Sequence, residues 1–123
     1  MVESPEEYLE AAPEVGRPWL REFWTYVRET YPDQELTMFR QTPMFKFGRS
    51  YQDGYVMFTA AKGHFAAHSV DFDLVEQTRQ AIPGARGGKG SVAVKYTNEA
   101  AKPELRRFVD AVMARHGIAA AAG

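Results

Sequence analysis

The stretch AAKGHFAAHS, residues 60–69, places two of the chain's three histidines four residues apart, just after a lysine. On a helix, His64 and His68 at this spacing would share one face and could bind a single zinc ion. Either imidazole could instead act as a general base in an enzyme. The choice depends on whether the segment is a helix or a pair of strands.

The segment is predicted to be a β-hairpin. Lys62-Gly63 separates two runs of aromatic, β-branched and small residues, and such a dipeptide favours a two-residue turn. This turn places Met57 opposite His68, and His64 on the same sheet face as His68. Four residues of strand span ~13 Å at ~3.3 Å each, so the two histidines cannot bind the same metal ion.

The two faces of the predicted hairpin differ in composition. The apolar face, predicted to lie in the core, carries Val56, Phe58, Ala60, Phe65 and Ala67, with Val92 and Val94 of a later strand. The other face carries His64 and His68 with Tyr55, Met57, Thr59 and Ala66, and Lys46, Ala93 and Lys95 beside them. Its small residues leave room for a shallow binding site. A solvated face with ordinary surface histidines is the alternative.

A second candidate is the glycine-rich loop GARGGKGS, residues 84–91. It is not a Walker phosphate loop, because Pro83 replaces the first glycine, Gly90 follows the lysine, and the order is helix to strand. Backbone amides beside Arg86 and Lys89 could still bind an anion. A flexible connection is the alternative.

We expect the hairpin tip and this loop to meet at one end of the sheet if the following strand lies beside the hairpin. A bound anion or oxygen-rich ligand would then contact Lys62 or His64 together with Arg86 or Lys89. With His68, these residues form the predicted ligand-binding set.

The N-terminal segment gathers carboxylates that would suit a hard cation such as Mg²⁺ or Ca²⁺. They are Glu3, Glu6, Glu7, Glu10 and Glu14. The preference of a first helical turn for acidic residues is the alternative explanation. The sequence has no HExxH motif, nucleophile elbow or Ser-His-Asp order, so no catalytic residue is assigned.

The elements that position these residues follow from apolar periodicity and capping signals. Predicted helices cover about 5–12, 18–31, 71–82 and 103–116, with a short helical turn from Asp33 to about Phe39. Predicted strands cover 44–50, 55–61, 64–70 and 91–97. The order α-α-β-β-β-α-β-α predicts an α+β fold, with one layer of helices on an antiparallel sheet of about four strands.

Length and composition limit the classes of protein to which this chain can belong. The 123 residues predict one domain, with a core over about 5–116 and a frayed tail at 118–123. A net charge of −1 gives no general attraction for nucleic acid or an anionic membrane. The absence of cysteine excludes disulfides and thiolate metal sites, and no apolar run is long enough for a membrane span. We therefore expect a cytoplasmic protein.

Several of these pieces resemble the YdhG-like family, largely a domain of unknown function. They are Pro43 followed by Phe45 and Phe47, the strand leading to Lys62 and His64, and Lys89-Gly90-Ser91 opening an apolar strand. The resemblance covers roughly residues 5–116 and implies a compact α+β domain. It also implies a link to iron, because some bacterial members are described as frataxin-like iron chaperones.

Together, these observations predict a non-enzymatic binding domain for a small ligand or a metal ion, with iron suggested by the resemblance alone. Two other functions remain open. One is an enzyme with His64 or His68 as general base. The other is a protein-interaction module, which would need a large exposed apolar patch.

Overall fold

The computed structural model describes residues 2–121. Its helices are α1 (Pro5–Ala11), α2 (Arg17–Thr30), α3 (Phe72–Ala81) and α4 (Lys102–Arg115). Its strands are β1 (Leu36–Phe39), β2 (Thr42–Lys46), β3 (Tyr55–Ala60), β4 (Phe65–His68) and β5 (Ser91–Val94). Short 3-10 turns are η1 (Glu14–Gly16), η2 (Tyr51–Asp53) and η3 (Glu99–Ala101).

The first helix begins at Pro5, as predicted, with Ser4 as its N-cap residue. The Ser4 hydroxyl accepts a hydrogen bond from the Glu7 amide at 3.1 Å, and Pro5 occupies the first turn, where its missing N–H costs nothing. The longer helix α2 buries one apolar stripe, formed by Trp19, Leu20, Phe23, Trp24 and Val27.

The strands form one antiparallel sheet in the order β1-β2-β3-β4-β5. The register around the Lys62-Gly63 turn is the predicted one, because Met57 pairs with His68. An α+β fold with helices on an antiparallel sheet is therefore confirmed, with five strands rather than about four.

The additional strand lies where a helical turn was predicted between Asp33 and Phe39. That prediction is wrong: β1 pairs along its whole length with β2. The turn that joins them is Arg40-Gln41, with positive φ at both residues (51° and 66°). Hairpin turns with two positive φ angles usually contain glycine, asparagine or aspartate, so the residues Arg40-Gln41 do not indicate a hairpin.

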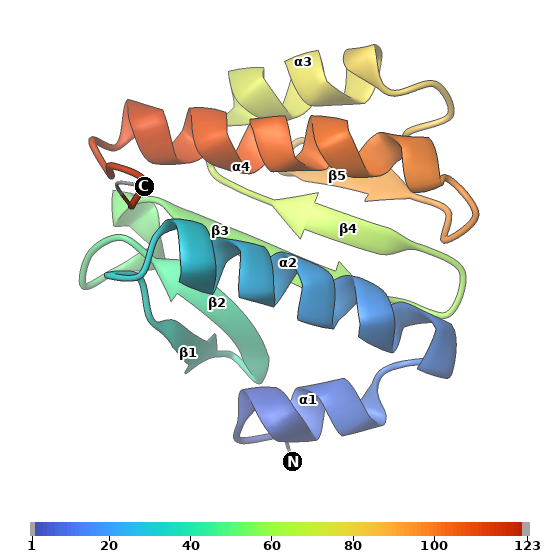
Figure 1. The fold of residues 1–123 in the computed structure, drawn as a ribbon, viewed down its shortest axis with the longest axis horizontal. Coiled ribbons are helices and arrows are strands. Elements are labelled where there is room, and N and C mark those ends of the chain that lie inside the picture. Colours follow the sequence, from blue (N-terminus) through green and yellow to red (C-terminus); the bar gives the residue numbers. More distant parts are fainter. Residues whose placement is uncertain (1, 122–123) are drawn as a thin grey trace.

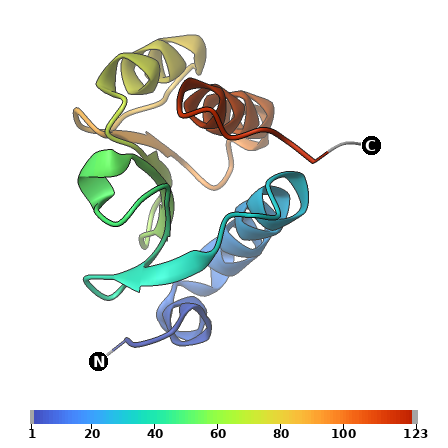
Figure 2. The same cartoon turned by 90° about the vertical axis from the view of Figure 1, so that its left-hand side faces the viewer.

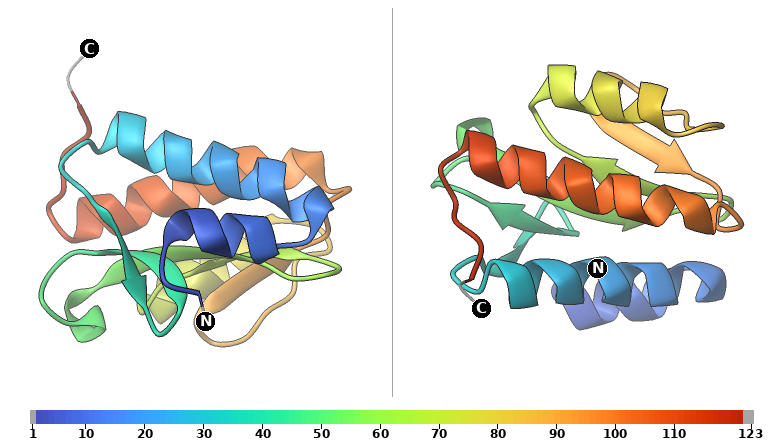
Figure 3. Two further views of the ribbon diagram at one scale, coloured as in Figure 1. Left: turned by 90° about the horizontal axis from the view of Figure 1, so that it is seen from below. Right: turned by 45° about the horizontal axis from the view of Figure 1, so that its top comes forward.

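All four helices cover the same side of the sheet, in the spatial order α1, α2, α4, α3 (Figures 1 and 3). The rings of Phe23 on α2, Phe58 on β3 and Phe65 on β4 meet with centroids 5.2 to 5.9 Å apart. Buried aromatic pairs of this kind add ~0.5–1.5 kcal/mol beyond the burial of their surface. The predicted apolar face of the hairpin is thus the core face.

The C-terminal segment passes from the end of α4 to the end of α2. Ile118 packs against the core, and the Ala121 amide donates to the Thr30 carbonyl at 2.7 Å. Residues 122 and 123 of the predicted tail lie outside the described residues. Within 2–121, no helix has both the length and the apolar character that a membrane span requires.

Candidate functional site

The side of the sheet away from the helices is the candidate site, and we call it the open face (Figure 2). Paired residues of neighbouring strands point to the same face, so the register assigns its members. They are Thr37, Phe39, Thr42, Met44, Lys46, Tyr55, Met57, Thr59, Ala66, His68, Ser91 and Ala93. None of these strand positions carries a carboxylate.

The centre of the open face has a floor of small residues. Thr59, Ala66 and Ala93 are paired in one row across β3, β4 and β5. The row continues to Arg86, which forms an antiparallel bridge with Ala93 through backbone hydrogen bonds of 2.8 and 2.7 Å. Arg86 therefore lies at the end of this row, on the open face.

The two histidines of the hairpin flank this row. His68 follows Ala66 by two residues on β4. His64 precedes Ala66 by two residues and lies just before the strand, so both histidines are on the same face as Ala66. Thr59, His64, His68 and Arg86 thus surround a floor formed by Ala66 and Ala93, which we call the alanine floor. The shallow site predicted from the small residues is compatible with this placement.

His68 is held in its neutral form. Its Nε2 lies 2.8 Å from the Thr59 hydroxyl. Burial lowers the pKa of His68 from 6.5 to about 4, and the positive charge of nearby His64 lowers this pKa further in the same direction. At neutral pH the imidazole can therefore donate or accept a hydrogen bond without carrying a charge.

The predicted meeting of Lys62 at the hairpin tip with Lys89 of the glycine-rich loop is wrong. Phe65, next to the tip, pairs with Val94 at the end of β5, whereas Ser91 at the start of β5 pairs with His68. Lys62 and Lys89 therefore lie at opposite ends of these strands. An antiparallel β5 must begin where β4 ends, so its entry loop is remote from the β3–β4 turn.

Lys89 has a local partner instead. Its ammonium lies 4.8 Å from the centroid of the Phe72 ring at the start of α3. Lys62 is exposed at the hairpin tip. Of the predicted ligand-binding set, the structure brings His64, His68 and Arg86 together and leaves Lys62 and Lys89 apart.

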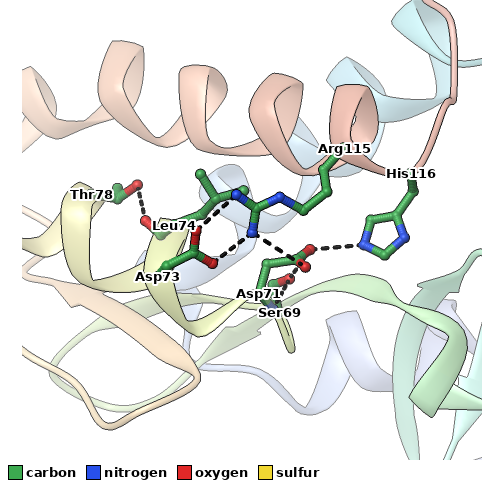
Figure 4. A network of polar contacts seen from close by, with 7 residues as sticks. All are labelled: Ser69, Asp71, Asp73, Leu74, Thr78, Arg115 and His116. Atoms are coloured by element: carbon green, nitrogen blue, oxygen red, sulfur yellow. Dashed lines mark hydrogen bonds and ion pairs between the residues drawn. The ribbon is translucent and has the colours of Figure 1, made fainter.

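A second polar cluster, which the sequence did not indicate, joins the ends of α3 and α4 (Figure 4). Asp71 at its centre lies 2.9 Å from His116 Nε2 and accepts a hydrogen bond from the buried Ser69 hydroxyl at 3.3 Å. Arg115 reaches Asp71 at 3.7 Å and holds Asp73 with two bonds of 2.6 and 2.8 Å. We call this group the Asp71 cluster.

The imidazole of the Asp71 cluster is also packed against the β2–β3 connection. The rings of Phe47 and His116 are 5.0 Å apart. Gly54 has a φ of +110°, and a Cβ at this position would come within 2.5 Å of the His116 ring. Asp71 and His116 are 45 residues apart in the sequence, and no local motif relates them.

Serine, histidine and aspartate occur together in the Asp71 cluster, but not in the order of a catalytic triad. Ser69 and His116 both bond to the carboxylate, so the imidazole is not placed to take a proton from the hydroxyl. Asp71 is the N-cap residue of α3, but its side chain makes no capping bond. The cluster is a structural connection between elements.

Iron, which the family resemblance implied, finds no fitting donor set. Among residues 2–121, no three His, Asp or Glu side chains are close enough to hold one metal ion. The N-terminal carboxylates include Glu6 and Glu7 in the first turn of α1, where acidic residues favour the helix dipole. The two imidazoles of the open face, His64 and His68, are too far apart to bind one ion, and the cationic side chains beside them would repel it.

Fold and site together define an α+β domain with one helix-covered and one open sheet face. No protein-family model matches this chain, and neither does any curated protein sequence. A solved structure matches it: a protein from the DUF1801 family, YdhG of Bacillus subtilis, with a TM-score of 0.73. At 16% identity, over 91% of this chain and 90% of that one, the match shows a shared fold, as the YdhG-like resemblance implied.

Proposed function

We propose that this protein is a non-enzymatic, cytoplasmic binding domain of the YdhG-like family that holds a small anion on the alanine floor. The observation that supports this proposal is the ring of Thr59, His64, His68 and Arg86 around two alanines on a face without carboxylates at its strand positions. A guanidinium and hydroxyl or imidazole donors are groups that bind phosphate or carboxylate oxygens.

The charge of this region favours an anion over a cation. Arg86 has no carboxylate within ion-pair distance among residues 2–121, so its charge is available to a ligand. Lys95, two residues beyond Ala93 and exposed, follows the same alternation toward the open face. His68, which is neutral because burial lowers its pKa to about 4, can add an uncharged hydrogen-bond donor to a bound anion.

The alternatives predicted from the sequence receive less support. A protein-interaction module needs a contiguous apolar patch, but the exposed large hydrophobic side chains of residues 2–121 are Val15 and Phe72, on separate elements. An enzyme with His68 as general base would need an imidazole that is basic near neutral pH, but burial lowers the pKa of His68 to about 4 and so makes it a weak base.

The proposal is tested by measuring the binding of inorganic phosphate, citrate and ferrous iron, using thermal shift and calorimetry at pH 7.5. We expect an anion to bind, and Arg86→Gln to weaken this binding about tenfold. Arg107→Gln, which removes an exposed arginine from α4, is the matched control and should leave binding unchanged. Equal affinity in both variants, or stabilisation by iron alone, would contradict the proposal.

A further inference from the structure

The β1–β2 hairpin carries a cluster of aromatic rings and cations on the open face, away from the alanine floor. The rings of Phe39 and Tyr51 are 5.3 Å apart. The guanidinium carbon of Arg40 lies 5.0 Å from the Phe39 centroid and 5.8 Å from that of Tyr51. The Lys46 ammonium lies 5.8 Å from the Phe39 centroid.

The sheet register explains why these groups meet. Phe39 on β1 and Lys46 on β2 are both open-face positions, and Tyr51 of η2 packs its ring against that of Phe39. Both rings remain partly exposed. A flat ligand can therefore reach them without unfolding any element.

The cations of this hairpin are not neutralised by the chain. No carboxylate of residues 2–121 lies within ion-pair distance of Arg40 or Lys46. Asp33 and Glu35 line a depression of about 360 Å³ with Lys46, but neither forms an ion pair with it. The guanidinium stacked on a ring keeps its N–H groups free to bind an anion at its edge.

The conformation that holds Arg40 in place is a strained one. Arg40 and Gln41 both have positive φ, a region that glycine adopts without cost and that most residues avoid. Strain of this kind persists where the surroundings determine the conformation, and it is concentrated at functional sites. In this turn it places the guanidinium over Phe39 and Tyr51.

We propose that the β1–β2 hairpin binds a small anion that carries a flat aromatic ring, such as a nucleoside monophosphate. The ligand's ring packs against the exposed edges of Phe39 and Tyr51, beside the Arg40 guanidinium. The phosphate or carboxylate is bound by Arg40 and Lys46. This site is separate from the alanine floor, so either can exist without the other.

The test compares three probes by calorimetry: AMP, ribose 5-phosphate, which lacks the ring, and adenosine, which lacks the charge. We expect AMP to bind at least tenfold more tightly than either of the others. Ribose 5-phosphate that binds as tightly as AMP would overturn the inference, even if the alanine floor binds phosphate.

Two glycine variants distinguish the effect of losing the Arg40 guanidinium from the effect of changing the turn conformation. Arg40→Gly and Gln41→Gly both relieve a positive φ, so neither should lower the midpoint of thermal unfolding. Arg40→Gly should weaken AMP binding about tenfold, whereas Gln41→Gly should leave it unchanged. Equal affinity in the two variants would show that the guanidinium does not bind the ligand and would overturn the proposal.

Discussion

His68 and His116 show how differently one residue type is used in this molecule. His116 has a carboxylate at 2.9 Å, a tilted aromatic ring and a glycine packed against it, all from other elements of the chain. His68 has one hydroxyl partner and lies on an open sheet face beside small residues. The first imidazole is held by several contacts within the fold, whereas the second makes a single hydrogen bond and stays neutral.

The largest expected effect tests the two faces of β4, on which the position of His68 depends. Phe65→Ala should lower the free energy of unfolding by about 3–5 kcal/mol, because the ring is fully buried against Phe23 and Phe58. Urea unfolding measures this change. His64→Ala, an exposed neighbour on the other face, is the control and should stay within about 0.5 kcal/mol. A loss below about 1 kcal/mol for Phe65→Ala would show that the faces are reversed.

The second effect is a pH dependence that belongs to His68 and not to the Asp71 cluster. The folded pKa of about 4 lies below the ordinary value of 6.5, so the unfolded chain binds this proton first as the pH falls. Stability is therefore lost between pH 6.5 and 4, by up to about 3 kcal/mol from this group, at 1.36 kcal/mol per pKa unit.

Urea unfolding at several pH values measures this dependence. His68→Gln should remove it, and the difference between wild type and variant isolates it from the carboxylates that titrate at lower pH. His64→Gln is the control and should retain most of the dependence. If His68→Gln and the wild type lose stability in parallel down to pH 4, then His68 is not desolvated in the folded protein.

A smaller loss is expected when the Asp71 cluster is broken. Asp71→Ala leaves the buried Ser69 hydroxyl and the His116 imidazole without their shared acceptor, which should cost about 1–3 kcal/mol in urea unfolding. Asp73→Ala removes an exposed partner of the same Arg115 and should cost clearly less. Equal losses in the two variants would mean that the cluster does not connect the helices.

The last prediction is that zinc does not change the stability of the protein through His64 and His68. Zinc should not stabilise the protein through His64 and His68 together, because strand geometry separates them by ~13 Å. Thermal shift with zinc is the measurement, on the wild type and on both single alanine variants. A large stabilisation that is lost in each variant would contradict the register of the hairpin.

The hairpin around residues 55–68 could be predicted because its signals are local. A Lys-Gly turn and alternating side chains determine both register and faces, and the structure has the pairs that they imply. The strand β1 could not be predicted in this way, since Arg40-Gln41 adopts by strain a turn that glycine adopts freely. Its pairing depends on tertiary contacts, which the residues of the turn do not reveal.

The candidate site was predicted in part, for a related reason. Alternation alone placed His64 and His68 on one face. The position of the glycine-rich loop depended on the direction of β5, and the wrong end of the sheet was chosen for Lys89. The Asp71 cluster joins residues distant in the sequence, and such contacts leave no periodic signal in a single chain.

The contact between Gly54 and His116 has a consequence for how the chain is made. Synthesis proceeds from the N-terminus, so the β2–β3 connection and the start of α3 are complete long before His116 is added. Until then Asp71 lacks its imidazole partner, and Gly54 lacks the His116 ring that packs against it. On the ribosome, the nascent sheet can pair early, but this contact with the end of α4 must wait until His116 has emerged.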